Sequence, residues 1–226
     1  MVMRRLQTSV LVELNHHIAS IQACRQCPDM QLSPVTGQVV ASNVMLVGQA
    51  PGDKEPVMQK PFAWTAGKTL FKWFWDACGI DEETFRSRVY MAAVCRCFPG
   101  KKPRGGDRVP SAAEIATCSR WLQAEMALLK PALVLPVGKL AMAQFMDYRS
   151  MEAHIGQQVQ CTYGGHTFDA IPLPHPSGAS PWPRIEPGKT LLHTALQLIS
   201  AHPAMAGIKT RGIASRPNLL SEQLLL

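Results

Sequence analysis

The chain has 226 residues, a formal net charge of +7 and seven cysteines. This length suffices for one well-buried domain, and the excess of basic residues favours a polyanionic partner, with nucleic acid first. Glu13, His16 and His17 interrupt the apolar core that a signal peptide needs, and no apolar run is long enough to span a bilayer. These features argue against an exported or membrane protein, so we expect a monomeric, cytoplasmic protein whose thiols stay reduced.

Helical and strand-like segments alternate along the chain. Apolar residues at helical spacing predict a helix from Arg4 to Gln22, and the apolar run Asn43–Val47 predicts a buried parallel strand. Further helices are expected over 68–78, after Ser111, over 139–146 and over 189–200, and further strands over 88–94, over 132–137, around 159 and over 168–173. The alternation predicts one three-layer α/β/α domain over residues 1–202 with a central, mostly parallel sheet, followed by a surface tail over 203–226. Ser111 and Glu114 have the spacing of a capping box.

Four of the cysteines form a candidate ligand set. Cys24 and Cys27 follow the first helix as a C-x-x-C pair, which alone could bind zinc or act in redox chemistry. A third ligand comes from Cys95 or Cys97, and Cys118 lies early in the helix after Ser111. Four thiolates suit a 4Fe-4S cluster or zinc. We expect the other two, Cys78 and Cys161, to be small buried hydrophobic residues.

Two further motifs complete a recognisable order. Gly48-Gln49-Ala50-Pro51-Gly52 is followed by Lys60-Pro61-Phe62 and Ala66-Gly67, and His175-Pro176-Ser177 lies near the end of the chain. With the cysteines, from about Cys24 to about Ile199, the chain resembles the iron-sulfur uracil-DNA glycosylases of family 4, near the UdgX-type branch. The resemblance implies the fold of these glycosylases. It also implies that the protein removes uracil, or another deaminated base, after the base has been flipped out of DNA. It also favours Cys97 as the third ligand of a 4Fe-4S cluster, with zinc as the alternative.

The resemblance assigns roles to the pocket residues. Phe62 would stack on the flipped base, and His175 would donate to the base oxygen. Gln49 would orient water, with Asp53 or Glu55 as carboxylates that could act in its place. The remaining substrate-binding positions are Gly48, Ala50, Ala93 and Ser177.

Several positions depart from the family pattern. Gln49 replaces an acidic residue, Ala93 replaces an asparagine that reads the uracil edge, and Trp64 replaces a glycine. Asp107 or Arg108 stands where the UdgX-type branch has a histidine that bonds covalently to the sugar, so we expect no covalent adduct. Gln49 and Ala93 favour an alternative function, a non-catalytic DNA-binding or damage-sensing protein.

Basic and aromatic residues are expected to contact DNA. Phosphate contacts are predicted for Lys101, Lys102, Arg104 and Arg108, and Trp182 is predicted to wedge into the duplex. Judged without the family, each feature has a structural interpretation. Phe62 fits a core residue, His175 a loop cap, the basic run a solvated surface, and Trp182 an aromatic packed against its own prolines.

Overall fold

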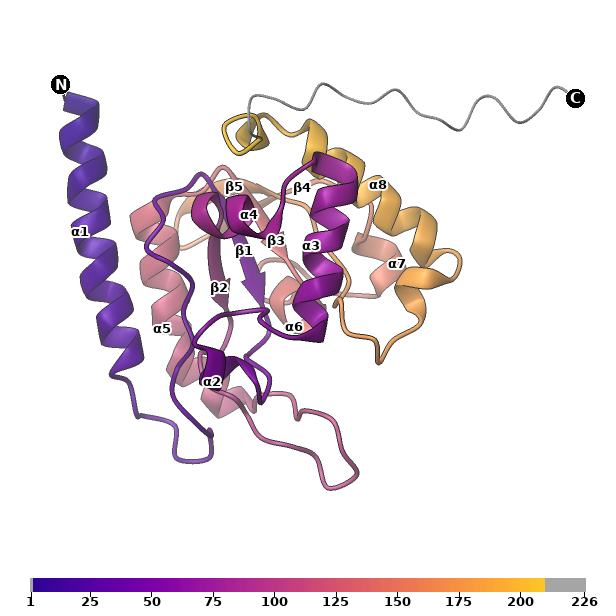
Figure 1. Cartoon of the computed structure of the whole chain (residues 1–226), viewed down its shortest axis with the longest axis horizontal. Helices are drawn as coiled ribbons and strands as arrows, with labels where there is room; N and C mark the ends of the chain where they lie inside the picture. The colour runs from indigo at the N-terminus through magenta and orange to yellow at the C-terminus, as the bar shows by residue number, and fades with distance from the viewer. Residues whose placement is uncertain (1, 210–226) are drawn as a thin grey trace, which may run out of the picture.

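In the computed structural model, which describes residues 2–209, one five-stranded sheet runs through the middle of the described part (Figure 1). The strands are β1 (Val44–Gly48), β2 (Tyr90–Ala93), β3 (Leu133–Pro136), β4 (Val159–Tyr163) and β5 (His166–Ala170). Their order is β2-β1-β3-β5-β4, and every pair is parallel except β4 with β5. The predicted sheet, central and mostly parallel, is confirmed.

Helices cover both faces of this sheet (Figure 1). They are α1 (Val2–Gln22), α2 (Glu55–Met58), α3 (Thr65–Cys78), α4 (Glu82–Arg88), α5 (Ala112–Leu129), α6 (Lys139–Met142), α7 (Met151–His154) and α8 (Gly188–Ala201), with 3-10 turns η1 (Trp182–Arg184) and η2 (Pro203–Met205). The predicted capping box begins α5, because Ser111 Oγ accepts from the Glu114 amide and the Glu114 carboxylate accepts from the Ser111 amide.

Alternating side chains of β1 divide the core into two halves. Val44 and Leu46 pack with the apolar residues of α3 and α8, whereas Met45 and Val47 pack with those of α1 and α5. All four side chains are fully buried. A strand buried on both faces needs a continuous apolar run instead of polar alternation. That requirement explains why this strand could be predicted from its sequence, and the three-layer α/β/α prediction is confirmed.

Two boundaries differ from the prediction. The second strand was expected from Arg88, but helix α4 ends there and β2 begins at Tyr90. Asp81 caps α4 by accepting from the Thr84 amide, a local signal that the prediction missed. The helix expected over 139–146 ends at Met142 and continues as tighter turns.

The core extends beyond the expected start of the tail. Met205 and Ile208 are 0% and 5% exposed and pack in the α3/α8 half of the core. The prediction of a surface tail from residue 203 was therefore wrong for residues 203–208, and its remainder over 210–226 lies outside the described residues. None of the helices in residues 2–209 has the length and apolar character to cross a membrane.

The sheet order marks where a ligand site should form. β1 has β2 on one side and β3 on the other, so the order of strands along the chain reverses at β1. In open parallel sheets the crevice beyond the carboxyl ends of the strands at such a reversal is the usual ligand site. The loop after β1, residues 48–52, begins at this point and is called the glycine loop below.

Candidate functional site

A pocket of about 730 Å³ lies at the carboxyl ends of β1 and β2. It brings together most of the site residues that the sequence predicts, from segments far apart along the chain. Those that line it are Gly48, Gln49, Ala50, Asp53, Phe62, Ala93, Lys101, Lys102, His175, Ser177 and Trp182. Arg104 and Arg108 lie outside its lining. A single concave site therefore collects both pocket motifs.

Phe62 packs against the start of the glycine loop. A Cβ on Gly48 would lie 3.1 Å from two carbons of the Phe62 ring, so this close approach requires glycine. Phe62 is 9% exposed, and its backbone has φ of +53°, in the left-handed region that non-glycine residues rarely adopt. Phe62 is therefore both a core residue and part of the pocket wall. The two interpretations, a core residue and a face for the base, are compatible.

Arg86, which the sequence analysis did not single out, holds Phe62 in this conformation. Its guanidinium donates to the carbonyls of Pro61 and Phe62 at 2.8 and 3.1 Å, and it lies 4.6 Å from the centroid of the Phe71 ring. Glu82, one helical turn earlier, accepts from its Nε at 2.8 Å. A buried arginine in an amphipathic helix has no sequence signal that separates it from a surface one.

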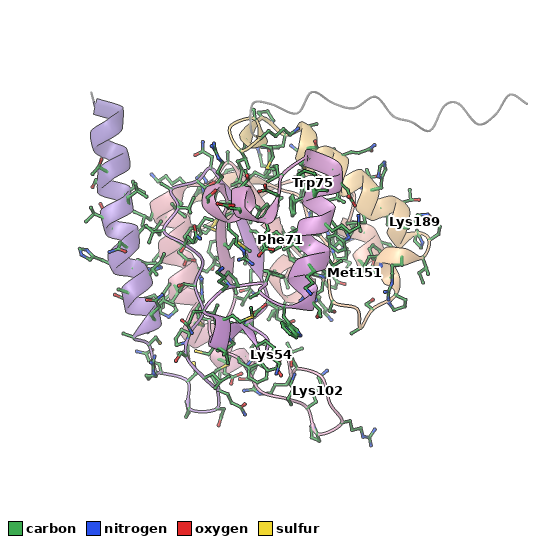
Figure 2. The ribbon with its side chains drawn as sticks, in the orientation of Figure 1. Lys54, Phe71, Trp75, Lys102, Met151 and Lys189 are labelled. Atoms are coloured by element: carbon green, nitrogen blue, oxygen red, sulfur yellow. The ribbon has the colours of Figure 1, made fainter. Side chains whose placement is uncertain are left out.

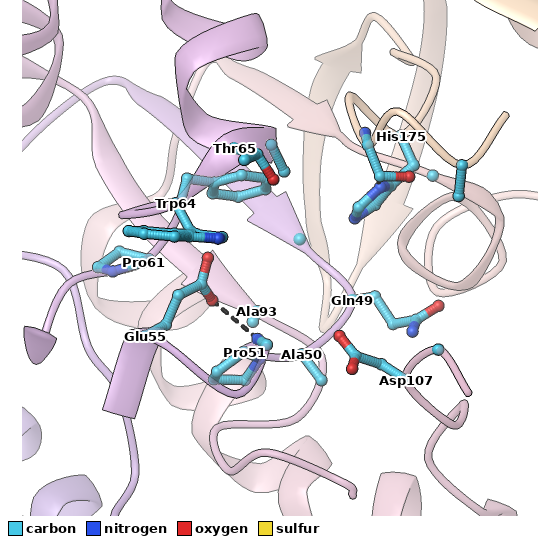
Figure 3. Close-up of a pocket in the computed structure, with 18 of the residues that line it drawn as sticks. Gln49, Ala50, Pro51, Glu55, Pro61, Trp64, Thr65, Ala93, Asp107 and His175 are labelled. Atoms are coloured by element: carbon cyan, nitrogen blue, oxygen red, sulfur yellow. Dashed lines mark hydrogen bonds between the residues drawn. The ribbon is translucent and has the colours of Figure 1, made fainter. Parts of the chain in front are cut away.

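His175 presents a defined nitrogen to the pocket. The Ser177 backbone amide donates to His175 Nδ1 at 3.2 Å. Burial holds the pKa of His175 below its ordinary value, against the opposing effect of the Asp107 charge, so the ring is neutral at pH 7. With Nδ1 as acceptor, the proton of the neutral ring is on Nε2. His175 therefore offers an Nε2–H donor, and Figure 3 shows its ring directed into the pocket.

Gln49 and Asp107 lie side by side at the glycine loop (Figure 3). Asp107 Oδ2 is 3.4 Å from the position of a Cβ on Gly52. Its other oxygen accepts from Lys101 Nζ at 2.6 Å. The sequence analysis noted Asp107 only as the counterpart of a missing histidine. The structure brings its carboxylate into the pocket, where the loop between residues 98 and 110, called the basic loop below, approaches the glycine loop at Gly52.

The two acidic residues after the glycine loop point in different directions. Asp53 lies at the rim, 3.4 Å from Lys101 and 4.0 Å from Lys54. Glu55 is turned inward, where its carboxylate accepts from the Gly52 amide at 3.0 Å, as Figure 3 shows. Burial raises the pKa of Glu55 to about 7, although amide hydrogen bonds from Gly52, Phe62 and Ala63 oppose the rise. Glu55, instead of Asp53, is therefore the inward carboxylate of this segment.

Glu55 should give the stability of the fold a distinct pH dependence. Its folded-state pKa of about 7 exceeds the ordinary glutamate value of 4.5, so its stabilising contribution is complete below pH 4.5 and is lost as the pH rises through 7. Glu55→Gln does not titrate. We expect the melting temperature of the wild type, relative to Glu55→Gln, to fall by a few degrees between about pH 4.5 and 8.

Asp81→Asn provides a control of opposite sign. The Thr84 amide holds the pKa of Asp81 below its usual value, so its contribution is lost as the pH falls instead. Thermal melts of the three proteins, extended below pH 3.8 so that the loss of the Asp81 contribution is covered, test the assignment. A difference between wild type and Glu55→Gln that stays constant or grows with pH would contradict it.

A second pocket, of about 250 Å³, is lined by four of the cysteines and is called the cysteine pocket. Its lining includes Cys24, Cys27, Cys97 and Cys118, whereas Cys95 is fully buried outside it. The residues alone did not decide whether Cys95 or Cys97 is the third ligand. The structure places only Cys97 in the lining of the pocket with the other three. Cys161 is buried in the core, as expected, whereas Cys78 is only partly buried and packs against the core.

Cationic groups surround the cysteine pocket. Arg120 Nη2 is 3.7 Å from Cys24 Sγ, and Arg96 lines the same pocket. Burial, together with the charges of the neighbouring thiols, raises the pKa of Cys97 to about 12. Four thiolates in this space therefore need positive charge, which the arginines supply in part.

Arg96 is fixed by a buried network behind the cysteine pocket. Its guanidinium pairs with Glu125, which is fully buried and also accepts from the Tyr90 hydroxyl at 2.6 Å. His17 Nε2 lies 3.6 Å from the same carboxylate. Burial disfavours the charged form of Glu125, but the Arg96 charge and these hydrogen bonds hold its pKa below the ordinary value. The network joins α1, the end of β2 and α5.

The residues predicted to contact DNA have different surroundings. Lys102 and Arg104 are exposed on the basic loop, which projects from the body in Figures 1 and 2. Arg108 instead donates to both oxygens of Glu114, and to the Asp29 carbonyl at 3.2 Å. Its guanidinium is therefore used inside the protein, where the sequence analysis expected a phosphate contact.

Trp182 is also held in place. Its indole Nε1–H donates to Glu152 at 2.6 Å, and its ring would collide with any Cβ on Gly188. The side chain lines the pocket and packs against the core. Trp64, in contrast, is 50% exposed and lies at the pocket mouth beside Glu55 (Figure 3).

Comparisons with known proteins agree with this arrangement. Residues 34–199 match a family model described as the uracil DNA glycosylase superfamily. A type-4 uracil-DNA glycosylase of Thermotoga maritima is 27% identical over 70% of this chain and 78% of its own length. Enzymes with the same name are 25% identical in Archaeoglobus fulgidus, over 73% of this chain and 81% of theirs, and 24% identical in Sulfurisphaera tokodaii, over 70% and 71%. The chain belongs to the uracil DNA glycosylase superfamily.

Proposed function

We propose that this protein is a monofunctional DNA repair glycosylase that hydrolyses the N-glycosidic bond of uracil, or of another deaminated base, and leaves an abasic site. The observation that carries the proposal is the convergence of Gln49, Phe62 and His175 on one pocket at the carboxyl ends of β1 and β2. The target bond is unreachable inside a duplex, so the base must leave the stack and enter such a pocket.

Phe62 and His175 would act on the base. The aromatic face of Phe62 accepts any flipped pyrimidine, because stacking is tolerant of sequence. As the bond breaks, negative charge develops on the base, and the Nε2–H of His175 is directed to stabilise it at a base oxygen. A neutral donor suits this role because it requires no protonation at pH 7. Ser177 positions the ring through its backbone amide.

Gln49 would act on the attacking water. Its amide can orient a water through its oxygen and its N–H groups, although it accepts no proton. Gly48 and Ala50 bring the backbone close to the substrate, and Ala93, at the end of β2, leaves space at the base edge. Because Ala93 offers no side-chain hydrogen bond, we expect tolerance of more than one deaminated base.

The DNA backbone would follow the exposed cations around the pocket mouth. Lys102 and Arg104 extend from the basic loop, and Lys101 lines the pocket. Such contacts give affinity without sequence choice. Trp64 adds an exposed aromatic face at the mouth, and Trp182 forms part of the wall.

The assay that tests the function uses oligonucleotides that contain uracil, hypoxanthine or xanthine, with alkali to reveal abasic sites. We expect cleavage of the uracil substrate. Gln49→Ala should lower the single-turnover rate by roughly ten- to a thousandfold, the range for loss of a placed polar group near a transition state. Gln49→Glu should keep or raise activity, because it adds negative charge near the sugar cation.

Gln158→Ala is the matched control, since Gln158 is exposed outside the pocket. Its rate should equal that of the wild type. A wild type that releases no base, together with a Gln49→Glu variant that does, would instead support the non-catalytic DNA-binding alternative.

We also propose that the cysteine pocket holds a 4Fe-4S cluster through Cys24, Cys27, Cys97 and Cys118. Three observations support the fit: four thiols line one pocket, Arg96 and Arg120 supply positive charge, and the ligands come from three distant segments. Within residues 2–209 no three His, Cys, Asp or Glu side chains converge closely enough for one metal ion. Four thiolates suit zinc as well as a cluster, so zinc is the alternative occupant. When bound, the group would join these segments structurally.

The cluster assignment predicts a colour and a composition. Protein purified without air should be brown and contain iron and sulfide in equal amounts. Serine at any of the four ligand positions should bleach it, because each removes one of the thiolates. Cys95→Ser and Cys161→Ser are the matched controls and should remain brown. Stoichiometric zinc without sulfide would show the alternative metal.

A further inference from the structure

The glycosylase mechanism above lacks a group that can accept a proton from water. Gln49 orients water but has no basic atom for this purpose. Three carboxylates line the pocket, those of Asp53, Glu55 and Asp107. Each has a different position and different partners, so the structure distinguishes between them.

Asp53 and Glu55 are poorly placed for the reaction. Asp53 has Lys101 and Lys54 at 3.4 and 4.0 Å from the same carboxylate oxygen, Oδ2, so this oxygen faces two cations. Glu55 is partly buried below Trp64, and its carboxylate accepts from the backbone amide of Gly52 (Figure 3). That hydrogen bond ties α2 to the glycine loop, which gives Glu55 a structural task.

Asp107 is placed differently. Its Oδ1 is held by Lys101 Nζ at 2.6 Å, while its Oδ2 faces the glycine loop, 3.4 Å from a Cβ position on Gly52. Figure 3 shows the carboxylate beside Gln49, on the same side of the pocket as His175. The side chain is 39% exposed, so water can reach it. One oxygen is therefore anchored and the other is directed to the place where Gln49 would hold a water.

The Asp107 charge also acts across the pocket. It opposes the lowering of the His175 pKa that burial causes, which means that the two groups interact electrostatically. The negative charge of a carboxylate in the pocket favours positive charge near it. Positive charge develops on the sugar between the attacking water and the leaving base, so the same field would stabilise the transition state.

We propose that Asp107 is the catalytic carboxylate of this protein, an inference that rests on the proposed glycosylase function. The water that Gln49 orients attacks C1′ of the flipped nucleotide and gives a proton to Asp107. The bond between C1′ and the base nitrogen breaks, and its electron pair leaves with the base, which His175 stabilises by its hydrogen bond. The proton then passes from Asp107 to the departing base through solvent, so the products are the free base and an abasic sugar.

The experiment compares four proteins in single-turnover cleavage of a uracil oligonucleotide. They are the wild type, Asp107→Asn, Asp76→Asn, and Asp107→Asn combined with Gln49→Glu. Asp76 is the matched control because it forms a similar lysine pair, 2.7 Å from Lys72, on α3 away from the pocket. Binding to an oligonucleotide with a tetrahydrofuran abasic analogue and a thermal melt are measured for each protein.

We expect Asp107→Asn to lower the cleavage rate by about 10²- to 10⁴-fold, the usual contribution of a general base. Affinity for the abasic analogue and the melting temperature should change little. Asp76→Asn should match the wild type. Adding Gln49→Glu to Asp107→Asn should raise the cleavage rate at least tenfold above that of Asp107→Asn alone, because it returns a carboxylate to the same place.

Two outcomes would overturn the inference while the wild type is active. Asp107→Asn within threefold of the wild-type rate would show that no proton goes to this residue. Loss of rate without any rescue by Gln49→Glu would assign Asp107 to anchoring the basic loop through Lys101. A wild type that releases no base from uracil, hypoxanthine or xanthine substrates would be a different result, since it overturns the proposed function itself.

Discussion

His175→Ala should reduce the rate of base release by about 10²- to 10³-fold, the usual effect of removing one donor from a developing oxyanion. The donor is the Nε2–H of a neutral ring, because the Ser177 amide occupies Nδ1. Its hydrogen bond strengthens only as charge moves onto the base. Affinity for an uncleaved or abasic oligonucleotide should therefore change much less than the rate.

Two variants sharpen this prediction. His175→Gln places an amide N–H in the same region and should recover part of the rate. His193→Ala is the matched control, since His193 is exposed on α8 outside the pocket. Single-turnover kinetics with a uracil oligonucleotide provide the measurement. An equal loss of rate and affinity in His175→Ala would assign the residue to DNA binding instead.

Glu125→Ala should have the largest effect on stability, about 3–5 kcal/mol of the free energy of unfolding, the usual cost of leaving a buried charge unpaired. Glu125 is fully buried and compensates Arg96, which is 2% exposed. Without the carboxylate the guanidinium has no anion, and the Tyr90 hydroxyl loses its acceptor. Because Arg96 lies between Cys95 and Cys97, the variant should also retain less metal.

Controls separate the lost charge from the lost volume. Tyr90→Phe should cost only about 0.5–1.5 kcal/mol, since it removes one hydrogen bond and no charge partner. Replacing both charges, in Arg96→Met with Glu125→Leu, should cost much less than Glu125→Ala, because no unpaired charge remains and only the Tyr90 hydroxyl is left without its acceptor. Urea denaturation gives the free energies. If Glu125→Ala lowers the free energy of unfolding by less than Tyr90→Phe does, water must reach the Arg96 guanidinium.

Local patterns predicted most of the fold. The run Val44–Val47 is apolar because both faces of β1 are covered, and the capping box of α5 depends on residues three apart. Both are properties of a short segment. Ile208, in contrast, packs in the core with α3 and α8. The residues next to Ile208 in the sequence therefore do not predict that it is buried.

The candidate site was predictable only where a motif carried it. Gln49, Phe62 and His175 lie in motifs, and the pocket collects them. Arg86 and Asp107 lie in none. The role of Arg86 depends on its hydrogen bond to Phe62, 24 positions away, and that of Asp107 on its place beside Gln49, 58 positions away. The sequence left Asp53 and Glu55 as alternatives for the same reason, since only the turn after Gly52 decides which carboxylate points inward.

The pocket is built from two backbone segments, the end of β1 and the basic loop, and local unfolding of each should require a different free energy. Hydrogen bonds continue past the strand, where the Gly48 and Gln49 carbonyls accept from the Val94 and Cys95 amides, so this backbone separates only when the sheet does. The basic loop is closed by bonds within itself, such as that from the Lys102 amide to the Gly106 carbonyl. Its local opening would remove Asp107 from Gln49 while the rest of the molecule stays folded.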